Sequence, residues 1–371
     1  MANLKTKNLS LIIYFVFVLN MPILACTGIT LCSKDGGFVV GRTVEWALSN
    51  AHLNDILVVP RNKKFRGLPQ ESLQCKEWTG KYGFITMTAY GQDFGPDGLN
   101  ENGLYVGVYY LPNYADYAEY SVEDAKKSLS LGGLMQWVLS SFKNVDEVIE
   151  NLDGIKVVQV DSKEYGGAPM PFHMKIADDR GNSKIIEIVN NGEIKIYDPF
   201  LGVITNAPTY DWHLTNLSNY LNLSTTASTP KSFGDYTIKS FGGGSGLLGL
   251  PGDYTSPSRF VRAATLTATC RPLETSTDAV FESFRILDNF NIPIGAQVPA
   301  DKIPEKMESV TQITSSSDLK NRVYYFHTMG NRNIRKIELN KIDFATVKET
   351  VIKDNTGSIQ EIKDVTPIDG K

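Results

Sequence analysis

Residues 26–46 read CTGITLCSKDGGFVVGRTVEW, two β-rich runs on either side of the turn sequence SKDGG. Two such runs joined by a short Asp-Gly-Gly turn are typical of a β-hairpin. If the turn is centred on its aspartate, residue i lies opposite a residue numbered roughly 70 − i. Cys26 is then expected opposite Val44, close to Glu45 and within side-chain reach of Arg42.

Residues 1–25, before this hairpin, have the pattern of a secretory signal peptide. Lysines near the start precede an apolar run over residues 9–19, and the segment ends on the small residue Ala25. Asn20 and Pro22 hold the run well below the roughly 20 residues of a spanning helix, so we expect no stable membrane span. Cleavage after Ala25 would export the protein to the bacterial periplasm or exterior.

After this cleavage Cys26 would carry both a thiol and a free α-amine. The α-amine has an unperturbed pKa of about 7.7–8.0, so near neutral pH part of it can accept the thiol proton as the sulfur attacks a carbonyl. The sequence ILAC also fits a lipoprotein signal, in which the cysteine is lipidated and its amine acylated. That alternative predicts a lipidated envelope protein that binds a ligand and lacks this catalysis.

The histidines and the other cysteines indicate neither a second nucleophile nor a metal site. Each of the four histidines lies in an ordinary strand or loop context; they are His52, His173, His213 and His327. The four cysteines include no C-x-x-C pair, so we expect no metal ion and no organic cofactor. One disulfide among Cys32, Cys75 and Cys270 is allowed in an exported protein. The formal net charge of −4, without a Lys/Arg-rich stretch, argues against a nucleic-acid partner.

Blocks of strands and blocks of helices are predicted along the rest of the chain. Strands are predicted over residues 56–60, 84–90, 104–110, 172–177, 184–189, 193–197, 202–205, 322–327 and 335–339. Helices are predicted over residues 129–142, 145–152 and 277–289, with a further one from an N-cap at Ser256. Such blocks favour an α+β layered fold over a doubly wound one, and residues 26–371 are expected to form one domain.

Several motifs in fixed order resemble the choloylglycine hydrolase and penicillin V acylase family. They are CTG at 26–28, GRTVEW at 41–46, WTGKYG at 78–83, GLNENGL at 98–104, GVITNAPTYDW at 202–212, and GLPGDY at 249–254 leading into SRFVR at 258–262. The resemblance implies the four-layer αββα sandwich of N-terminal nucleophile hydrolases. It also implies a homo-oligomer, namely a tetramer, for which the loop over residues 216–241 is a candidate contact.

The resemblance implies a role for three residues of the hairpin. Cys26 matches the nucleophile, and its α-amine matches the proton shuttle. Arg42 matches the arginine beside the nucleophile, where a cation favours the reactive thiolate. Glu45 stands where the family more commonly has an aspartate that orients the α-amine, so the chain departs from the pattern by one methylene.

Three later residues match the remaining active-site positions of the family. Asn206 and Tyr110 match oxyanion-hole positions, and Arg259 matches the second active-site arginine. The implied reaction is hydrolysis of a linear amide bond in a small molecule. We expect a bile-salt substrate of the choloylglycine type, because the GLPGDY and DWH motifs favour it. Tyr110 favours the alternatives, which are a penicillin V or acyl-homoserine-lactone acylase.

Overall fold

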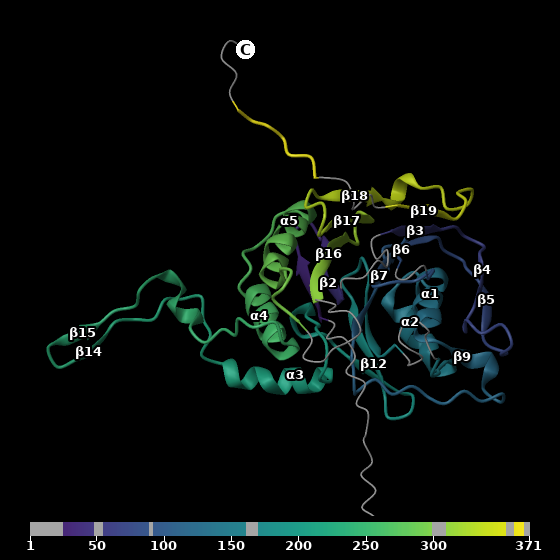
Figure 1. Ribbon diagram of the computed structural model, residues 1–371, viewed down its shortest axis with the longest axis horizontal. Coiled ribbons are helices and arrows are strands. Elements are labelled where there is room, and N and C mark those ends of the chain that lie inside the picture. The colour runs from purple at the N-terminus through teal and green to yellow at the C-terminus, as the bar shows by residue number, and fades with distance from the viewer. Residues whose placement is uncertain are drawn as a thin grey trace, which may run out of the picture.

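The computed structural model describes residues 25–47, 55–88, 92–160, 170–298, 309–353 and 360–366. The predicted signal peptide lies outside these residues, except for Ala25 at the start of the first strand. Two large β-sheets form the body of the protein, with helices on their outer faces (Figure 1). No helix within the described ranges is long and apolar enough to cross a membrane.

The first sheet, called sheet A here, is built on the predicted hairpin. Its strand order is β1-β2-β16-β17-β18. The bounds are Ala25–Cys32 for β1, Phe38–Ala47 for β2, Ser309–Asp318 for β16, Val323–Thr328 for β17 and Arg335–Glu338 for β18. Cys26 pairs with Val44, which confirms the register predicted from the turn.

Sequence analysis does not identify β16, although it lies in the middle of sheet A. Its sequence SVTQITSSSD has few apolar residues, yet every side chain in it is buried. Two of its serine hydroxyls find partners inside the protein, since Ser316 Oγ lies 2.7 Å from Ser283 Oγ and Ser315 Oγ donates to Asp97 Oδ2 at 2.8 Å. A buried strand that is rich in serine and threonine leaves no apolar pattern in the sequence.

The second sheet, sheet B, has the order β13-β12-β11-β8-β7-β6-β3-β19. In chain order the bounds are Ile56–Val59 for β3, Phe84–Met87 for β6, Asp97–Asn100 for β7, Tyr105–Tyr110 for β8, Phe172–Ala177 for β11, Ser183–Val189 for β12, Glu193–Tyr197 for β13 and Thr350–Ile352 for β19. The strand predicted over residues 202–205 is wrong. Residues 200–202 form a 3₁₀ turn, and Ile204 makes only an isolated bridge with Gly28.

Helices complete the layers on both sides. The bounds are Leu131–Ser141 for α1, Val145–Asn151 for α2, Tyr210–Asn216 for α3, Ser256–Ala268 for α4 and Ser276–Leu287 for α5. The N-cap of α4 is Thr255, one residue before the predicted Ser256. Short pairs of strands lie outside the two sheets, namely β4 (Lys64–Arg66) with β5 (Glu77–Thr79), β9 (Ser128–Leu129) with β10 (Lys156–Val157), and β14 (Lys231–Phe233) with β15 (Tyr236–Ile238).

The core follows the period-two alternation of the strands. Val40 and Val44 of β2 pack against Leu99 of sheet B. Their neighbour Gly41 faces α5 instead, because a Cβ there would lie 2.9 Å from Leu287 Cδ1. On the far side of sheet B, residues of β8 pack against α1. The layers therefore run helices, sheet A, sheet B, helices, and this confirms the predicted α+β class and αββα order.

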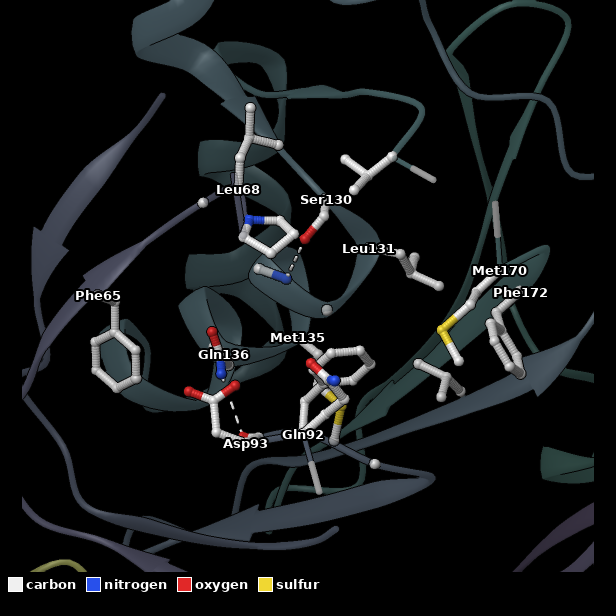
Figure 2. Close-up of a pocket in the computed structure, with 18 of the residues that line it drawn as sticks. Phe65, Leu68, Gln92, Asp93, Ser130, Leu131, Met135, Gln136, Met170 and Phe172 are labelled. Atoms are coloured by element: carbon white, nitrogen blue, oxygen red, sulfur yellow. Dashed lines mark hydrogen bonds between the residues drawn. The ribbon is translucent and has the colours of Figure 1, made fainter. Parts of the chain in front are cut away.

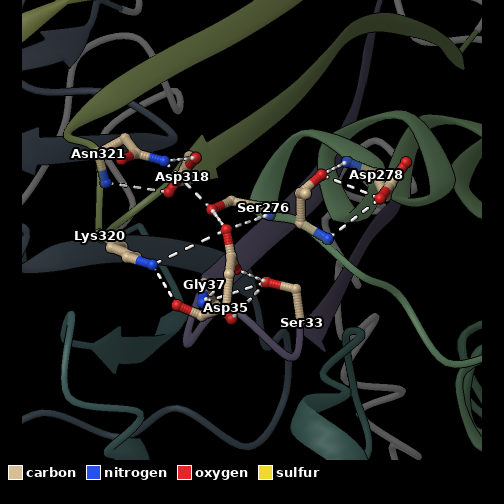
Figure 3. A network of polar contacts seen from close by, with 9 residues as sticks. Ser33, Asp35, Gly37, Ser276, Asp278, Asp318, Lys320 and Asn321 are labelled. Atoms are coloured by element: carbon tan, nitrogen blue, oxygen red, sulfur yellow. Dashed lines mark hydrogen bonds and ion pairs between the residues drawn. The ribbon is translucent and has the colours of Figure 1, made fainter.

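A polar network fixes the closed end of the hairpin (Figure 3). Asp35 in the β1–β2 turn accepts hydrogen bonds from Ser33 Oγ at 2.6 Å and from the backbone N of Ser276, the first residue of α5, at 3.2 Å. These bonds lower the pKa of Asp35 to about 2, and the bond from Ser33 has the largest effect. Asn321 in the β16–β17 turn donates to Ser276 Oγ at 3.1 Å. The turn is thus tied to both α5 and β16.

Candidate active site

Cys26 lies at the open end of the hairpin, between the two sheets. Its side chain is buried, and its backbone N donates to Asn206 Oδ1 at 2.6 Å. Residues opposite each other in an antiparallel pair share one face, so Cys26 lies on the face of Val44, toward sheet B. Cys26 also lines a cavity of about 630 Å³.

Arg259 approaches Cys26 from the helical side. The first turn of α4 carries this arginine, which is 1% exposed. Its guanidinium donates to the carbonyl O of Cys26, to Thr27 Oγ1 at 2.8 Å and to Asn206 Oδ1 at 2.6 Å. Its Nε donates to Tyr254 O at 2.9 Å, which anchors the side chain to the segment before the helix. The guanidinium therefore cross-links β1, α4 and Asn206.

Asn206 is oriented by these same contacts. Its Oδ1 receives hydrogen bonds from both Cys26 N and Arg259, so the oxygen end of the amide faces these donors and the nitrogen end points away. Nδ2 is buried and has no hydrogen-bond partner within the described ranges. The backbone N of Asn206 donates to Ser256 Oγ at 2.9 Å. The site thus holds an oriented amide next to Cys26 whose donor is unpaired among the described residues.

Arg42 lies on the opposite side of Cys26 from Arg259, against sheet B. Its Nη1 donates to Pro96 O and, at 2.9 Å, to Val108 O. Its guanidinium stacks over the Tyr109 ring, 4.3 Å from the centroid. Burial raises the pKa of the Cys26 thiol, and the positive charge of Arg42 is the largest effect that opposes this. Arg42 is thus placed to favour the thiolate.

Glu45 lies on the other face of β2 from Arg42, toward the helices. It pairs with Ala25, is fully buried, and its Oε1 accepts from Thr311 Oγ1 at 2.8 Å. Oε2 has no partner among the described residues. Burial raises the pKa of this carboxyl to about 7, although the positive charge of Arg259 acts to lower it. Because the two residues face opposite sides of β2, Glu45 and Arg42 do not form an ion pair. The role of Glu45 in orienting an α-amine stays a prediction.

Tyr110 is placed differently from the other predicted site residues. Its ring packs edge-to-face on Phe172, with centroids 5.8 Å apart, in the core between sheet B and α1. Its neighbour Tyr109 points the other way, toward Arg42. The structure thus gathers five of the six predicted residues around Cys26, namely Cys26 itself, Arg42, Glu45, Asn206 and Arg259, while the Tyr110 ring packs on Phe172, which lines the cavity. The catalytic roles of all six stay predictions.

Two threonines of the site escape sequence analysis. Thr27 accepts from Arg259, and Thr311 donates to Glu45. A threonine in a strand is usually an ordinary β-former, and Thr311 lies on the unpredicted strand β16. A sequence signal for Thr27 exists only in its position next to Cys26.

The cavity beside Cys26 is mostly apolar (Figure 2). Apolar side chains from several parts of the chain line it, among them Phe65, Leu68, Leu131, Met135, Met170 and Phe172. Polar groups on its wall are held in place, since Gln136 Nε2 donates to Asp93 O at 3.2 Å and Ser130 Oγ caps α1 through Gly133 N at 3.0 Å. The apolar part of such a cavity suits an apolar acyl group.

The chain resembles known proteins in family, in sequence and in structure. The model of the linear amide C–N hydrolases, choloylglycine hydrolase family, matches residues 26–357. A bile salt hydrolase/transferase of Clostridium perfringens is 32% identical over 319 residues, which cover 85% of this chain and 93% of that protein. A penicillin V acylase of Pectobacterium atrosepticum is 27% identical over 324 residues, covering 83% and 78%.

Solved structures agree with this. A mutant conjugated bile acid hydrolase from Clostridium perfringens superposes with a TM-score of 0.79 at 30% identity, covering 92% of this chain and 100% of that one. Penicillin V acylase from Agrobacterium tumefaciens shares the fold, with a TM-score of 0.68 at 23% identity over 88% of this chain and 90% of that one. Together these findings define an amide-hydrolysing enzyme with the N-terminal nucleophile hydrolase fold. The chain belongs to the choloylglycine hydrolase family of linear amide C–N hydrolases.

Proposed function

We propose that this enzyme hydrolyses the amide bond of conjugated bile salts, with Cys26 as nucleophile once cleavage after Ala25 has freed its amine. One observation carries the proposal: the nitrogen of Cys26 donates to the oriented amide of Asn206, and Cys26 lines a mostly apolar cavity. A peptide N–H at this position donates to Asn206 Oδ1, and the freed amine would keep that contact. The nucleophile and its base would then sit in one residue.

The reaction follows from this placement. The α-amine takes the thiol proton as Sγ attacks the substrate carbonyl carbon, and the carbonyl oxygen becomes an oxyanion that accepts from Asn206 Nδ2. The C–N bond then breaks, and the ammonium returns its proton to the leaving nitrogen. A water molecule, deprotonated by the same amine, hydrolyses the thioester and restores the thiol. Arg42 favours the thiolate throughout.

Bile salts are proposed as substrates because the apolar cavity suits a bulky acyl group, and the relative with 32% identity is named for bile salts. Penicillin V is the second candidate. It is favoured by Tyr110, whose ring packs on Phe172 in the cavity wall.

The test is a hydrolysis panel with purified mature protein. Glycocholate, taurocholate, penicillin V and acyl-homoserine lactones are compared by release of the amine product. We expect glycocholate or taurocholate to give the highest kcat/KM. Preference for penicillin V would replace the substrate but keep the mechanism, whereas no hydrolysis of any amide would reject both.

The mass of the mature N-terminus tests the lipidated alternative. An unmodified Cys26 supports the hydrolase, and an added diacylglyceryl group rejects it. Cys26→Ser, which keeps the amine but weakens the nucleophile, should then lower kcat sharply.

Export and self-assembly are part of the proposal. Cleavage after Ala25 requires an export route, so the expected compartment is the periplasm or the exterior. Residues 221–250 form an arm whose β14–β15 hairpin extends away from the body (Figure 1), and the arm exposes Phe233, Tyr236 and Phe241. Exposed aromatic residues on a projecting element favour contact with another copy. We expect a tetramer by light scattering, and a monomer at micromolar concentration would contradict this.

A further inference from the structure

The segment that carries Asn206 is not held by a sheet. Residues 204–206 pair with β1 at one point only, where Gly28 N donates to Ile204 O at 2.8 Å and Ile204 N donates back to Gly28 O at 3.0 Å. The next two residues, Thr205 and Asn206, are buried but continue no strand. Buried carbonyl groups without partners are costly, so their oxygens need donors from elsewhere.

Two histidines supply these donors. His173 Nε2 lies 3.0 Å from Thr205 O, and His213 Nε2 lies 2.8 Å from Asn206 O. Each histidine is 1% exposed. A carbonyl oxygen only accepts, so each Nε2 carries the proton that it donates. Consecutive peptide groups are therefore each held by one imidazole, from β11 and from α3.

The position of the His213 ring is fixed by α4. The ring stacks on Phe260, with centroids 4.6 Å apart and planes 9° from parallel. Its Nδ1 is buried with no partner in the described part of the chain, and burial lowers the pKa of His213 to about 4. The ring is therefore neutral near pH 7, with its single proton on Nε2. Phe260 follows Arg259, so one turn of α4 sets both the histidine and the arginine that contact Asn206.

The second histidine is tied to the first through Glu187. His173 Nδ1 lies 3.0 Å from Glu187 Oε1, and the same oxygen accepts from Tyr210 N at 2.9 Å. Tyr210 is the first residue of α3, the helix that carries His213. The carboxylate thus sets the position of α3 relative to β11, and with it the distance between the two imidazoles.

We propose that His173 and His213 are positioning residues that hold the Thr205–Asn206 peptide groups, and so aim Asn206 Nδ2 at the oxyanion. This inference rests on the proposed function and adds a requirement to it. The Asn206 side chain is anchored at its oxygen end, so the direction of Nδ2 depends on where the backbone holds its Cα. Displacement of a catalytic group by about 1 Å can cost about 100-fold in rate.

The test is His213→Leu, which keeps an apolar side chain against Phe260 but removes the donor to Asn206 O. We expect kcat for the best substrate of the panel to fall about tenfold or more, with KM within about twofold, because the cavity that binds the acyl group is untouched. Alkylation of Cys26 by iodoacetamide forms no oxyanion. Its rate is therefore expected to stay within about twofold of wild type.

Two further variants separate positioning from folding. His213→Gln places an amide N–H near the position of Nε2 and is expected to restore most of kcat. His327 is the matched control, because it is 5% exposed and packs on Phe284 at 5.4 Å, but lies on β17. His327→Leu should leave kcat unchanged.

The outcomes are distinguishable. Unchanged kcat in His213→Leu, or a fall in kcat and alkylation rate together, overturns the positioning role while wild type remains active. If kcat of His213→Gln is no higher than kcat of His213→Leu, the positioning role is overturned as well. A wild-type protein that hydrolyses no amide overturns the proposed function, and the positioning role with it.

Discussion

The two ends of β1 carry similar groups in different arrangements. Cys26 lies at one end beside the cavity of about 630 Å³, and Cys32 lies at the other beside a second cavity of about 710 Å³. Each thiol has a cation near it, since Arg42 lowers the pKa of Cys26 and Lys175 that of Cys32, while burial raises both. A thiol, a cation and a cavity therefore do not distinguish a reactive centre.

The two ends of β1 differ in whether the hydrogen-bond donors near the cysteine already have partners. Lys175 Nζ is committed to Thr30 Oγ1 at 2.5 Å and to Gly202 O at 2.6 Å. At the other end Asn206 keeps an unpaired Nδ2 beside Cys26. An oriented donor that the folded protein leaves unused is what a developing oxyanion requires.

The largest expected effect separates the two cysteines. Cys26→Ala should lower kcat/KM for the best amide substrate by about 10³-fold or more, because it removes the attacking atom. Cys32→Ala should leave kcat/KM unchanged, as measured by release of the amine product. Comparable losses in both variants would mean that the second cavity takes part in the reaction.

The second-largest effect is expected from removing the amide donor of Asn206. Asn206→Ala should lower kcat by about 10²- to 10³-fold, the loss seen when one oxyanion donor is removed. Asn182, which lines the second cavity, is the matched control, and Asn182→Ala should leave kcat intact. Steady-state kinetics decide this, and an active Asn206→Ala protein would place the oxyanion elsewhere.

A smaller effect appears in the pH dependence of stability. Burial lowers the pKa of Lys175 to about 7, below its value in the unfolded chain. Between about pH 7 and 10.4 the unfolded chain therefore binds more protons, so this group makes stability rise with pH, by at most about 1.4 kcal/mol per pH unit.

Lys175→Met should remove this rise. The free energy of unfolding of both proteins, measured with urea from pH 7 to 10, gives the difference between the two slopes. Parallel curves would show that Lys175 is charged in the folded protein and is held by its two contacts.

The smallest effect is expected at Gly28. A Cβ there would lie 2.3 Å from Tyr109 Oη and 2.8 Å from Ile204 Cγ2, so Gly28→Ala must displace the ring under Arg42. We expect a loss of about 1–3 kcal/mol in the free energy of unfolding, typical of overpacking. Gly154→Ala is the control, because a Cβ there meets nothing within 4 Å. Equal stability of the two variants would contradict the close contact.

Local turn chemistry made part of this site predictable. The SKDGG turn determines the register that sets Cys26 opposite Val44 and close to Arg42, and the structure reproduces it. Motif resemblance indicated Asn206 and Arg259, which the structure brings to the same atoms.

Other parts depend on long-range packing that no local pattern reveals. Arg42 and Glu45 lie on opposite faces of β2 because side chains alternate along a strand. Their burial, however, depends on both sheets and on α4. Strand β16 is rich in serines and threonines, among them Ser316 with a partner in α5 and Ser315 with one in sheet B, so its sequence resembles a loop. In the sequence His173 and His213 lie in ordinary strand or loop contexts, and their contacts with the carbonyl groups of Thr205 and Asn206 arise only in the folded protein.

The late position of β16 also affects the order in which the enzyme can mature. Thr311 and Glu45 are in contact although they are 266 positions apart, so β2 gains its second neighbour only when most of the polypeptide has been synthesised. Contacts of such sequence separation form slowly. A nascent chain therefore carries Cys26 on an incomplete sheet until the C-terminal strands have been added.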